Sequence, residues 1–407
     1  MISACLITKN EERWIGELIE HLKPIVSEFI VVDTGSTDRT MEIARSLGAR
    51  VSQTKWENDF AKARNVSLAK ATQRWILIID PDERLAPEDL PKIRALCDAK
   101  DVMAYSFDSR NYARNPAVSN FKPCTGEYAA FEANYPGYFE SRKVRLFQNI
   151  PSIRFVGSVH ELVESTIKGK TIASDIPFHH YGSTPEVDAE KGKRSFYQAQ
   201  GQKKVHENPN DWKANFEMGI EYLGSKNFKQ AVVYLEKANA SKPGDALTLS
   251  NLGYAYMEAL QHDQSERILV ECVKLHPQHH DGLLNLGVNE MRRHQWDKAL
   301  KIMDAVIKRH PQSFLAYRNA GLCFAHMKKL QEASRCFERA LKIFPNYTEA
   351  RIDLGLVCFA AGRADLAKPV LEEAVKSDPR AMRAQAALKE INSFLARKNS
   401  PPIPPKP

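Results

Sequence analysis

The sequence lacks any long apolar segment. Its 407 residues are 43% hydrophobic, yet no apolar run approaches the roughly 20 residues that a membrane-spanning helix needs. The N-terminal stretch MISACLIT runs directly into the charged segment KNEER, so its apolar region is too short for a signal peptide. We therefore expect a cytoplasmic protein without a transmembrane segment.

Cysteine and concentrated positive charge are also scarce. The seven cysteines show neither CxxC nor Cys/His ligand spacing, which favours a reducing compartment and argues against a zinc site. The 58 Lys and Arg residues exceed the 50 Asp and Glu residues by 8, and this balance favours anionic partners such as phosphates, or peripheral contact with an anionic membrane surface. No basic block is present, so we expect no nucleic-acid partner.

The most regular feature of the sequence is an interval of 34 residues in its C-terminal half. It separates successive prolines at 209, 243, 277, 311, 345 and 379, and successive glycines at 219, 253, 287, 321 and 355. Small residues let two helices approach closely, and proline ends the second helix of a unit. The pattern resembles the tetratricopeptide repeat, a helix-turn-helix unit. A chain of this length favours two or three domains, of which the repeats form one.

The resemblance predicts five repeats over residues 209–379. A capping helix over 380–397 would cover the last repeat, followed by a disordered proline-rich tail over 398–407, and a polar helical connector over 186–208 would precede the first. Such arrays present a concave groove to a peptide or protein.

Three asparagines, Asn251, Asn285 and Asn319, share one phase of the repeat, two residues before the repeat glycine. In some relatives asparagines at this phase line the groove and bind the backbone of an extended polypeptide. An amide can both donate to and accept from a peptide bond. The alternative is that asparagine is simply tolerated on a solvated helix face.

Residues 1 to about 110 alternate apolar strands with amphipathic helices, from SACLIT and EERWIGELIEHL to the closing strand WILIID. This alternation predicts βαβ units with parallel strands and a ligand crevice at the carboxyl ends of the strands. In WILIIDPDERL, five apolar residues lead directly into Asp80, Asp82 and Glu83. Because burying unpaired carboxylates costs several kcal/mol, we expect a strand buried on both faces with the acids where it leaves the core.

Seven segments together resemble a family 2 glycosyltransferase of GT-A fold: CLITKNEE, VVDTGSTDRT, DFAKARN, LIIDPDE, KVRLF, FVGSVHE and HHYG. The resemblance covers residues 1–185, and the branch includes lipopolysaccharide-core glucosyltransferases and peptide S-glycosyltransferases with tetratricopeptide tails. It implies an α/β nucleotide-sugar-binding domain with a mixed, Rossmann-like sheet, followed by an all-α tetratricopeptide-repeat solenoid. It also implies metal-dependent, inverting transfer of a hexose from a nucleotide sugar, with a UDP-sugar favoured.

In this family an Asp-x-Asp segment holds Mg²⁺ or Mn²⁺ against the diphosphate of the donor. The resemblance therefore implies Asp82 as the first metal ligand, Asp80 as a second that acts directly or through water or ribose, and His180 as a histidine that reaches the metal or the diphosphate. As alternatives, the two acids cap the helix that begins near Pro87 or lie in a solvated loop, and His180 is a packing or surface residue.

The resemblance also assigns residues to the nucleotide. Asp33 would accept the imino hydrogen of the base, Thr8 and Glu11 would border the base and ribose, and Arg64 and Asn65 would contact the nucleotide. Glu11 would equally suit the first turn of a helix, and an arginine on a surface helix is commonly a solvated charge.

On the acceptor side, inverting transfer needs a base opposite the leaving diphosphate. The resemblance makes Glu161 the candidate base, with His160 as its orienter or alternative; a structural His-Glu pair between strands is the rival interpretation. Residues 110–140 are aromatic-rich and poorly periodic, and we interpret them as a long loop and candidate acceptor lid.

Three functions are compatible with the sequence, and the five repeats favour the first of them. The repeats would deliver a peptide or protein acceptor, or the enzyme would act on lipopolysaccharide or another cell-envelope glycan while the repeats recruit partner proteins. The third possibility is a repeat scaffold that no longer catalyses transfer.

Overall fold

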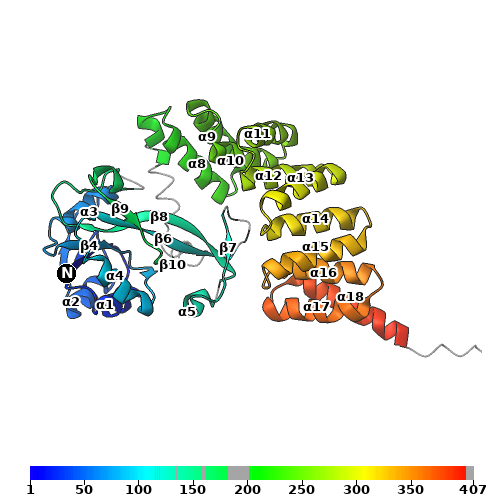
Figure 1. Cartoon of the computed structure of the whole chain (residues 1–407), viewed down its shortest axis with the longest axis horizontal. Helices are drawn as coiled ribbons and strands as arrows, with labels where there is room; N and C mark the ends of the chain where they lie inside the picture. The colour runs from blue at the N-terminus through cyan, green and yellow to red at the C-terminus, as the bar shows by residue number, and fades with distance from the viewer. Residues whose placement is uncertain are drawn as a thin grey trace, which may run out of the picture. The chain divides into compact units, whose positions relative to one another are not determined.

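The computed structural model describes residues 1–114, 116, 118, 120–133, 135–157, 161–181, 201–202 and 204–399. The chain divides into two compact units, Met1–Phe196 and Tyr197–Pro407 (Figure 1). Most of the expected connector over 186–208 lies outside the described residues, as does the tail from residue 400 onward. No helix within the described ranges is both long and apolar enough to cross a membrane.

The N-terminal unit is built on a mixed sheet, and in its described part the sheet has ten strands. They are β1 (Ile2–Thr8), β2 (Glu28–Asp33), β3 (Arg50–Gln53), β4 (Trp75–Ile78), β5 (Glu83–Arg84), β6 (Ala104–Ala113), β7 (Lys122–Pro123), β8 (Gly137–Gln148), β9 (Thr171–Ala173) and β10 (Phe178–His180). The main path runs β3-β2-β1-β4-β8-β6-β10-β5. β1 pairs in parallel with β2 and β4, whereas β8 is antiparallel to both β4 and β6. The predicted mixed α/β sheet is therefore confirmed.

Helices cover both faces of this sheet. Successive residues of its central strands point to opposite faces, so both faces carry apolar side chains. Trp75 and Leu77 of β4 pack on one face in a core shared with the helices α1, α2 and α4, and Ile76 and Ile78 pack on the other face with α3. The helices are α1 (Ile15–Leu22), α2 (Thr40–Ser46), α3 (Phe60–Leu68), α4 (Leu90–Leu96) and α5 (Ala129–Glu132), with short 3₁₀ turns at Pro87–Asp89 and Glu164–Thr166. The prediction that the WILI strand is buried on both faces is confirmed.

The interpretation of residues 110–140 as one long loop was wrong. β6 continues to Ala113 and β8 begins at Gly137, while β7 and α5 lie between them. The aromatic rings of this region pack against one another: Tyr112 stacks on Tyr135 with 5.1 Å between ring centroids, and Phe131 stacks on His179 at 4.2 Å. The sequence concealed these strands because strand residues that pack on aromatic neighbours need not alternate with polar ones.

The C-terminal unit consists of helix pairs that stack in sequence order (Figure 1). The helices are α8 (Trp212–Gly224), α9 (Phe228–Ser241), α10 (Ala246–Glu258), α11 (His262–Leu275), α12 (His280–Arg292), α13 (Trp296–Arg309), α14 (Phe314–His326), α15 (Leu330–Ile343), α16 (Thr348–Ala360), α17 (Ala364–Ser377) and α18 (Met382–Asn399). The first helices of successive pairs also touch one another, as α10 touches α12 and α12 touches α14. They therefore form one continuous surface of the array.

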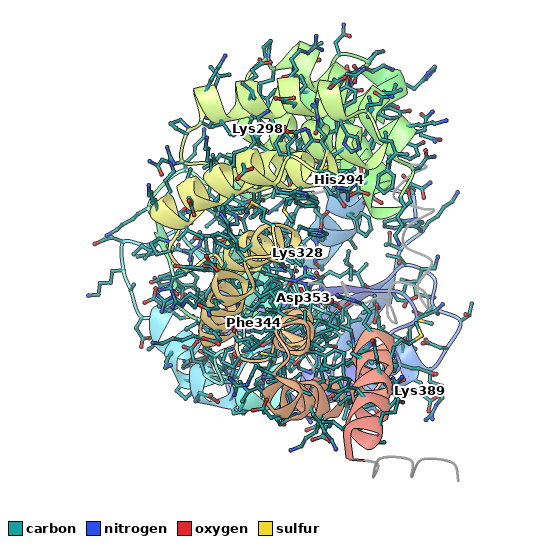
Figure 2. All side chains as sticks on the ribbon, turned by 90° about the vertical axis from the view of Figure 1, so that its right-hand side faces the viewer. His294, Lys298, Lys328, Phe344, Asp353 and Lys389 are labelled. Carbon is teal, nitrogen blue, oxygen red and sulfur yellow. The ribbon has the colours of Figure 1, made fainter. Side chains whose placement is uncertain are left out.

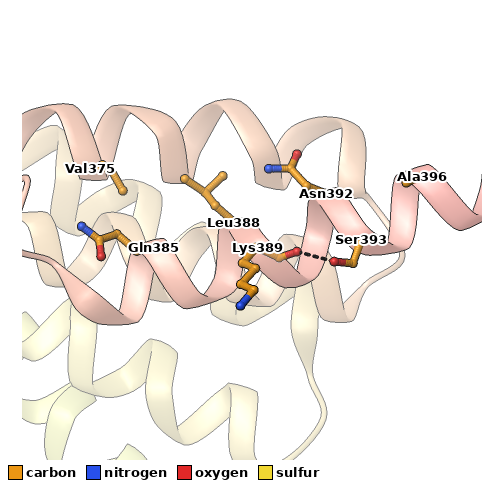
Figure 3. Close-up of a pocket in the computed structure, with 7 residues that line it drawn as sticks. All are labelled: Val375, Gln385, Leu388, Lys389, Asn392, Ser393 and Ala396. Carbon is orange, nitrogen blue, oxygen red and sulfur yellow. Dashed lines mark hydrogen bonds between the residues drawn. The ribbon is translucent and has the colours of Figure 1, made fainter.

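The final helix, α18, covers the apolar side of the last pair. Ala384, Ala387 and Ile391 are buried against Leu371 and Ala374 of α17. A hollow beside this contact is lined by Val375, Gln385, Leu388, Lys389, Asn392, Ser393 and Ala396 (Figure 3). Its lining holds a single charged side chain, that of Lys389, so it offers no ligand set for a metal or diphosphate.

The repeat glycines mark the closest approach of the two helices in each pair. A Cβ atom on Gly253 would lie 2.4 Å from Cγ of Leu269, and one on Gly219 would lie 2.5 Å from Cγ of Leu235. Neither distance is compatible with ordinary carbon–carbon contact. The small residues in the repeat pattern are thus required by helix packing.

We expect Gly253→Ala to lower the free energy of unfolding by about 1–3 kcal/mol, because the added methyl group overpacks the α10–α11 contact. Gly224→Ala is the matched control, since a Cβ there meets no atom within 4 Å. In a helix it should be neutral or stabilise by up to about 1 kcal/mol. Urea denaturation of the full chain, followed by circular dichroism, measures both, and equal losses would contradict the packing argument.

Candidate functional site

Charged side chains from the strands β5 and β8, the helix α3 and two loops meet at the carboxyl end of β4. Arg64 of α3 donates from Nη2 to Oδ1 of Asp80 over 2.9 Å and from Nε to Oε1 of Glu161 over 2.6 Å. Arg145 of β8 donates to Glu83, and its Nη1 lies 3.8 Å from Oδ2 of Asp80. Two arginines and three carboxylates therefore form one connected network.

Both arginines and Glu83 of this network are buried, which strengthens its electrostatic interactions, while the side chain of Asp80 is 30% exposed. Arg64 is 7% exposed and Arg145 6% exposed. Burial opposes ionisation of Asp80, but the charges of Arg64 and Arg145 outweigh it and lower the pKa of this carboxyl. At Glu83 burial is the larger effect and raises the pKa, although Arg145 opposes it. Asp80 is thus held as an anion.

The expectation that all the acids lie outside the core was wrong for Asp82 and Glu83, which are 4% and 1% exposed. It assumed carboxylates without partners, whereas Glu83 is paired with Arg145 and also accepts a hydrogen bond from the backbone of Asp80. The helix-capping alternative for Asp80 and Asp82 is also excluded, because the 3₁₀ turn ahead of α4 begins after Ala86 without a side-chain cap.

The strand β10 places a histidine beside Asp82. β10 pairs with β5 so that His180 lies opposite Glu83, and the backbone N–H of Tyr181 donates to the carbonyl of Asp82 over 3.3 Å. As a result Nε2 of His180 lies 3.7 Å from Oδ1 of Asp82. Arg84 donates to the carbonyls of Pro81 and Glu83, each over 2.8 Å, and so fixes the backbone on both sides of Asp82.

Asp82 and His180 together suit a divalent cation. A carboxylate oxygen and an imidazole nitrogen this close can bind the same ion, and Mn²⁺ accepts both types of ligand. Among the described residues, no group of three His, Cys, Asp or Glu side chains is assembled to hold a metal. In nucleotide-dependent enzymes Mg²⁺ commonly has only one or two carboxylate ligands and takes the others from phosphates and water.

The residues assigned to the nucleotide surround the ends of β1 and β2. Asp33 is fully buried, and its Oδ1 accepts the backbone N–H of Ser36 over 2.9 Å while its Oδ2 accepts Oγ1–H of Thr8 over 3.3 Å. Glu11 is buried as well, and its backbone N–H donates to Oγ1 of Thr40 over 2.7 Å. In this structure Asp33 shapes the loop after β2; its contact with a base stays a prediction.

Arg64 and Asn65 are neighbours in α3 with different partners. The solvated-charge alternative for Arg64 is excluded by its burial. Asn65 forms two hydrogen bonds with the backbone of Phe155, one to its carbonyl and one from its N–H, both 2.9 Å long. Asn65 thus anchors the segment after β8, whereas Arg64 reaches into the charged network.

On the acceptor side, the structure describes only one of the two candidate residues. His160 lies outside the described residues. Glu161 is paired with Arg64, whose Nε lies 2.6 Å from Oε1 of the glutamate, so this carboxylate oxygen is already engaged. This contact favours a structural role for Glu161 in the present arrangement, and its role as a base stays a prediction.

The three groove asparagines lie on the first helices of their pairs: Asn251 on α10, Asn285 on α12 and Asn319 on α14. All three are half-buried. Nδ2 of Asn251 donates to the carbonyl of Leu247 over 2.8 Å, one turn earlier in the same helix. Because the first helices of neighbouring pairs touch, the asparagines form a row along one surface of the array.

The sequence interpretation missed the residue that ends this row. Asp353 of α16 (Figure 2) follows Asn319 by the repeat interval of 34. It is 3% exposed and accepts from Nε of Arg318 over 2.7 Å and from Nη2 of Arg383 over 2.9 Å. The repeat interval alone would have found this residue, but the change from amide to carboxylate hid it.

Comparisons with known proteins define the class. Residues 3–156 match the family described as Glycosyl transferase family 2, and residues 284–348 and 324–391 match two families described as Tetratricopeptide repeat. The chain therefore carries a family 2 glycosyltransferase domain followed by tetratricopeptide repeats, and this prediction is confirmed.

Individual relatives match mainly through part of their length. A TPR repeat-containing protein of Synechococcus elongatus is 35% identical over 166 residues, which cover 41% of this chain and 36% of the relative. The SPbeta prophage-derived glycosyltransferase SunS of Bacillus subtilis is 30% identical over 162 residues, 39% of this chain and 34% of SunS. An uncharacterized glycosyltransferase of Rickettsia felis is 29% identical over 206 residues, 49% of this chain and 68% of the relative. The chain thus spans about a third of the length of the first two relatives.

Proposed function

We propose that this chain is a metal-dependent, inverting glycosyltransferase that moves a hexose from a nucleotide sugar, with a UDP-sugar favoured, to a peptide or protein side chain bound by its repeats. The observation that carries the proposal is the approach of His180 to Asp82 at the end of β4, within a family 2 domain. A carboxylate and an imidazole held together at the ligand-binding edge of an α/β sheet provide two ligands for a cation.

In this proposal Asp82 and His180 hold Mn²⁺ or Mg²⁺, which when bound neutralises charge on the leaving diphosphate. Arg84 keeps the Asp82 backbone in place. Asp80 is engaged by Arg64 and Arg145, so it serves the donor through water or ribose more readily than as a direct ligand.

The remaining assigned residues serve the nucleotide and the acceptor. Thr8, Glu11 and Asp33 border the base and ribose from the ends of β1 and β2. Glu161 or His160 takes the proton from the attacking hydroxyl or thiol, for which Glu161 has to exchange part of its contact with Arg64.

The proposal is tested by incubating the full chain with UDP-, GDP- and dTDP-sugars in Mn²⁺, in Mg²⁺ and in EDTA, and measuring release of the nucleoside diphosphate. We expect slow hydrolysis of one donor, with the metal required. If no donor is hydrolysed and calorimetry detects no donor binding in either metal, the proposed enzyme activity is overturned.

The acceptor role of the repeats predicts a separable effect. Replacing Asn251, Asn285 and Asn319 together with Ala should raise the KM for a peptide acceptor by about tenfold or more, because each lost hydrogen bond weakens binding by about 0.5–1.5 kcal/mol. Donor hydrolysis without acceptor should not change.

The matched control replaces three exposed amides on the second helices, Gln230, Gln264 and Gln331, with Ala. It should leave the KM for the peptide within about twofold. A triple asparagine variant that behaves like this control would remove the groove from the proposal and leave the donor chemistry intact.

A further inference from the structure

A buried amide holds the ring of His180. Asn111 of β6 lies opposite His180 of β10 in the sheet and is 6% exposed. Its Nδ2 donates to the carbonyl of Ser109 over 3.0 Å and to the carbonyl of Phe139 over 3.2 Å. It also lies 3.1 Å from Oγ of Ser141. The amide nitrogen is therefore fixed on the side away from the histidine, and Oδ1 is the atom that faces Nδ1 of His180, at 2.8 Å.

This orientation decides which ring nitrogen carries hydrogen. An amide oxygen can only accept, so Nδ1 of His180 must be the donor. The reversed amide would place its oxygen against two backbone carbonyls, which also only accept, and would lose both hydrogen bonds. Because a neutral imidazole carries one N–H, Nε2 is left with its lone pair. That nitrogen is the one 3.7 Å from Oδ1 of Asp82.

We propose that Asn111 is a positioning residue that fixes His180 as the Nδ1–H tautomer and so prepares Nε2 to bind the cation. The inference rests on the proposed function, because it takes the cation as its purpose. A lone pair on Nε2 facing a carboxylate oxygen is an unfavourable pairing by itself, and a cation between the two atoms makes it favourable. Partners that orient a ligating histidine through its second nitrogen are a general feature of metal sites.

The tautomer can be measured without metal. In ¹⁵N NMR of the metal-free full chain at about pH 8, above the ordinary histidine pKa of about 6.5, the two nitrogens of a neutral ring have distinct shifts. The signals of His180 are identified as those missing from His180→Gln. We expect an unprotonated Nε2 in the wild type and a mixture of tautomers in Asn111→Leu. Protonation of Nε2 in the wild type overturns the inference, whether or not any variant folds.

Metal affinity supplies the second readout, by calorimetry with Mn²⁺ and the nucleoside diphosphate of the preferred donor. Asn111→Leu should weaken Mn²⁺ binding by roughly 10–100-fold. Ser141→Ala removes a contact on the far side of the same amide and should change neither tautomer nor affinity.

The outcomes separate this inference from the function on which it rests. An equal loss of affinity in Ser141→Ala and Asn111→Leu shows a general structural effect and overturns the positioning role. If the wild type shows the expected tautomer but binds no Mn²⁺, the metal part of the proposed function fails and the purpose assigned to Asn111 fails with it. Wild-type metal binding with the opposite tautomer overturns the Asn111 inference alone.

Discussion

Asp82→Asn is expected to lower kcat/KM for metal-dependent donor turnover by about a thousandfold, corresponding to several kcal/mol of lost charge stabilisation in the transition state. The amide has the shape of the carboxylate but no charge with which to hold a divalent cation. The backbone at this position should persist, since Arg84 holds the carbonyls of Pro81 and Glu83 and Tyr181 binds the carbonyl of residue 82. Release of nucleoside diphosphate measures the loss of turnover, and calorimetry with Mn²⁺ measures the loss of cation binding.

The matched control is Asp98→Asn, the same substitution at an exposed position after α4. It should leave turnover within about twofold of the wild type. His180→Gln should resemble Asp82→Asn in direction, because it removes the second ligand. Metal-dependent turnover of Asp82→Asn at the wild-type rate would show that the cation, if one is used, binds elsewhere.

Arg64→Met is expected to lower the free energy of unfolding by about 3–5 kcal/mol. The substitution leaves Asp80 and Glu161 without their shared cation while roughly conserving side-chain volume, and uncompensated buried charges are costly. The side chain of Arg64 is 9% exposed and that of Glu161 13% exposed, so water cannot replace the lost partner of Glu161 well, whereas Asp80 is 30% exposed and keeps Arg145 at 3.8 Å. Chemical denaturation of the N-terminal unit within the full chain, followed by tryptophan fluorescence, measures the loss.

We also expect the effect of Arg64→Met on the free energy of unfolding to depend on pH. Arg64 and Arg145 overcome the burial of Asp80 and lower its pKa in the folded state. This contribution to stability is complete above the pKa of the unfolded chain, about 3.9, and is lost as the pH falls below it. The difference in unfolding free energy between wild type and Arg64→Met should therefore shrink below about pH 4. Glu83 stays paired with Arg145 in both proteins, so its own titration largely cancels.

Arg142→Met is the control for both effects. Arg142 pairs with Asp108 on the surface of the sheet, and its side chain is 40% exposed. Arg142→Met should lower the free energy of unfolding by less than about 1 kcal/mol. This loss should not shrink below about pH 4 to the extent expected for Arg64→Met. Equal destabilisation by the two arginine variants would contradict the assignment of Arg64 to a buried network.

The C-terminal repeats could be predicted from the sequence because the same helix-packing interactions recur in each unit. Each glycine of the 34-residue pattern faces the second helix of its own pair, as Gly321 faces Phe337, so this packing depends on residues close in the chain. The alternating strands were readable for a similar reason, since WILI buries its odd and even residues on opposite faces. The region around β6, β7 and α5 was not, because its aromatic residues pack through contacts distant in sequence.

The order of the domains, the repeat interval and the acids after β4 follow from local patterns and could be predicted from the sequence. The partners of those acids depend on contacts between residues far apart in the chain. Arg64 and Glu161 are 97 residues apart, and Asn111 and His180 are 69 apart, so no local pattern links them. The register between β5, β6 and β10 sets the pairing of Asn111 with His180, and a shift of one residue would turn His180 to the opposite face of the sheet. Hydrogen bonding between distant strands therefore decides whether His180 lies beside Asp82.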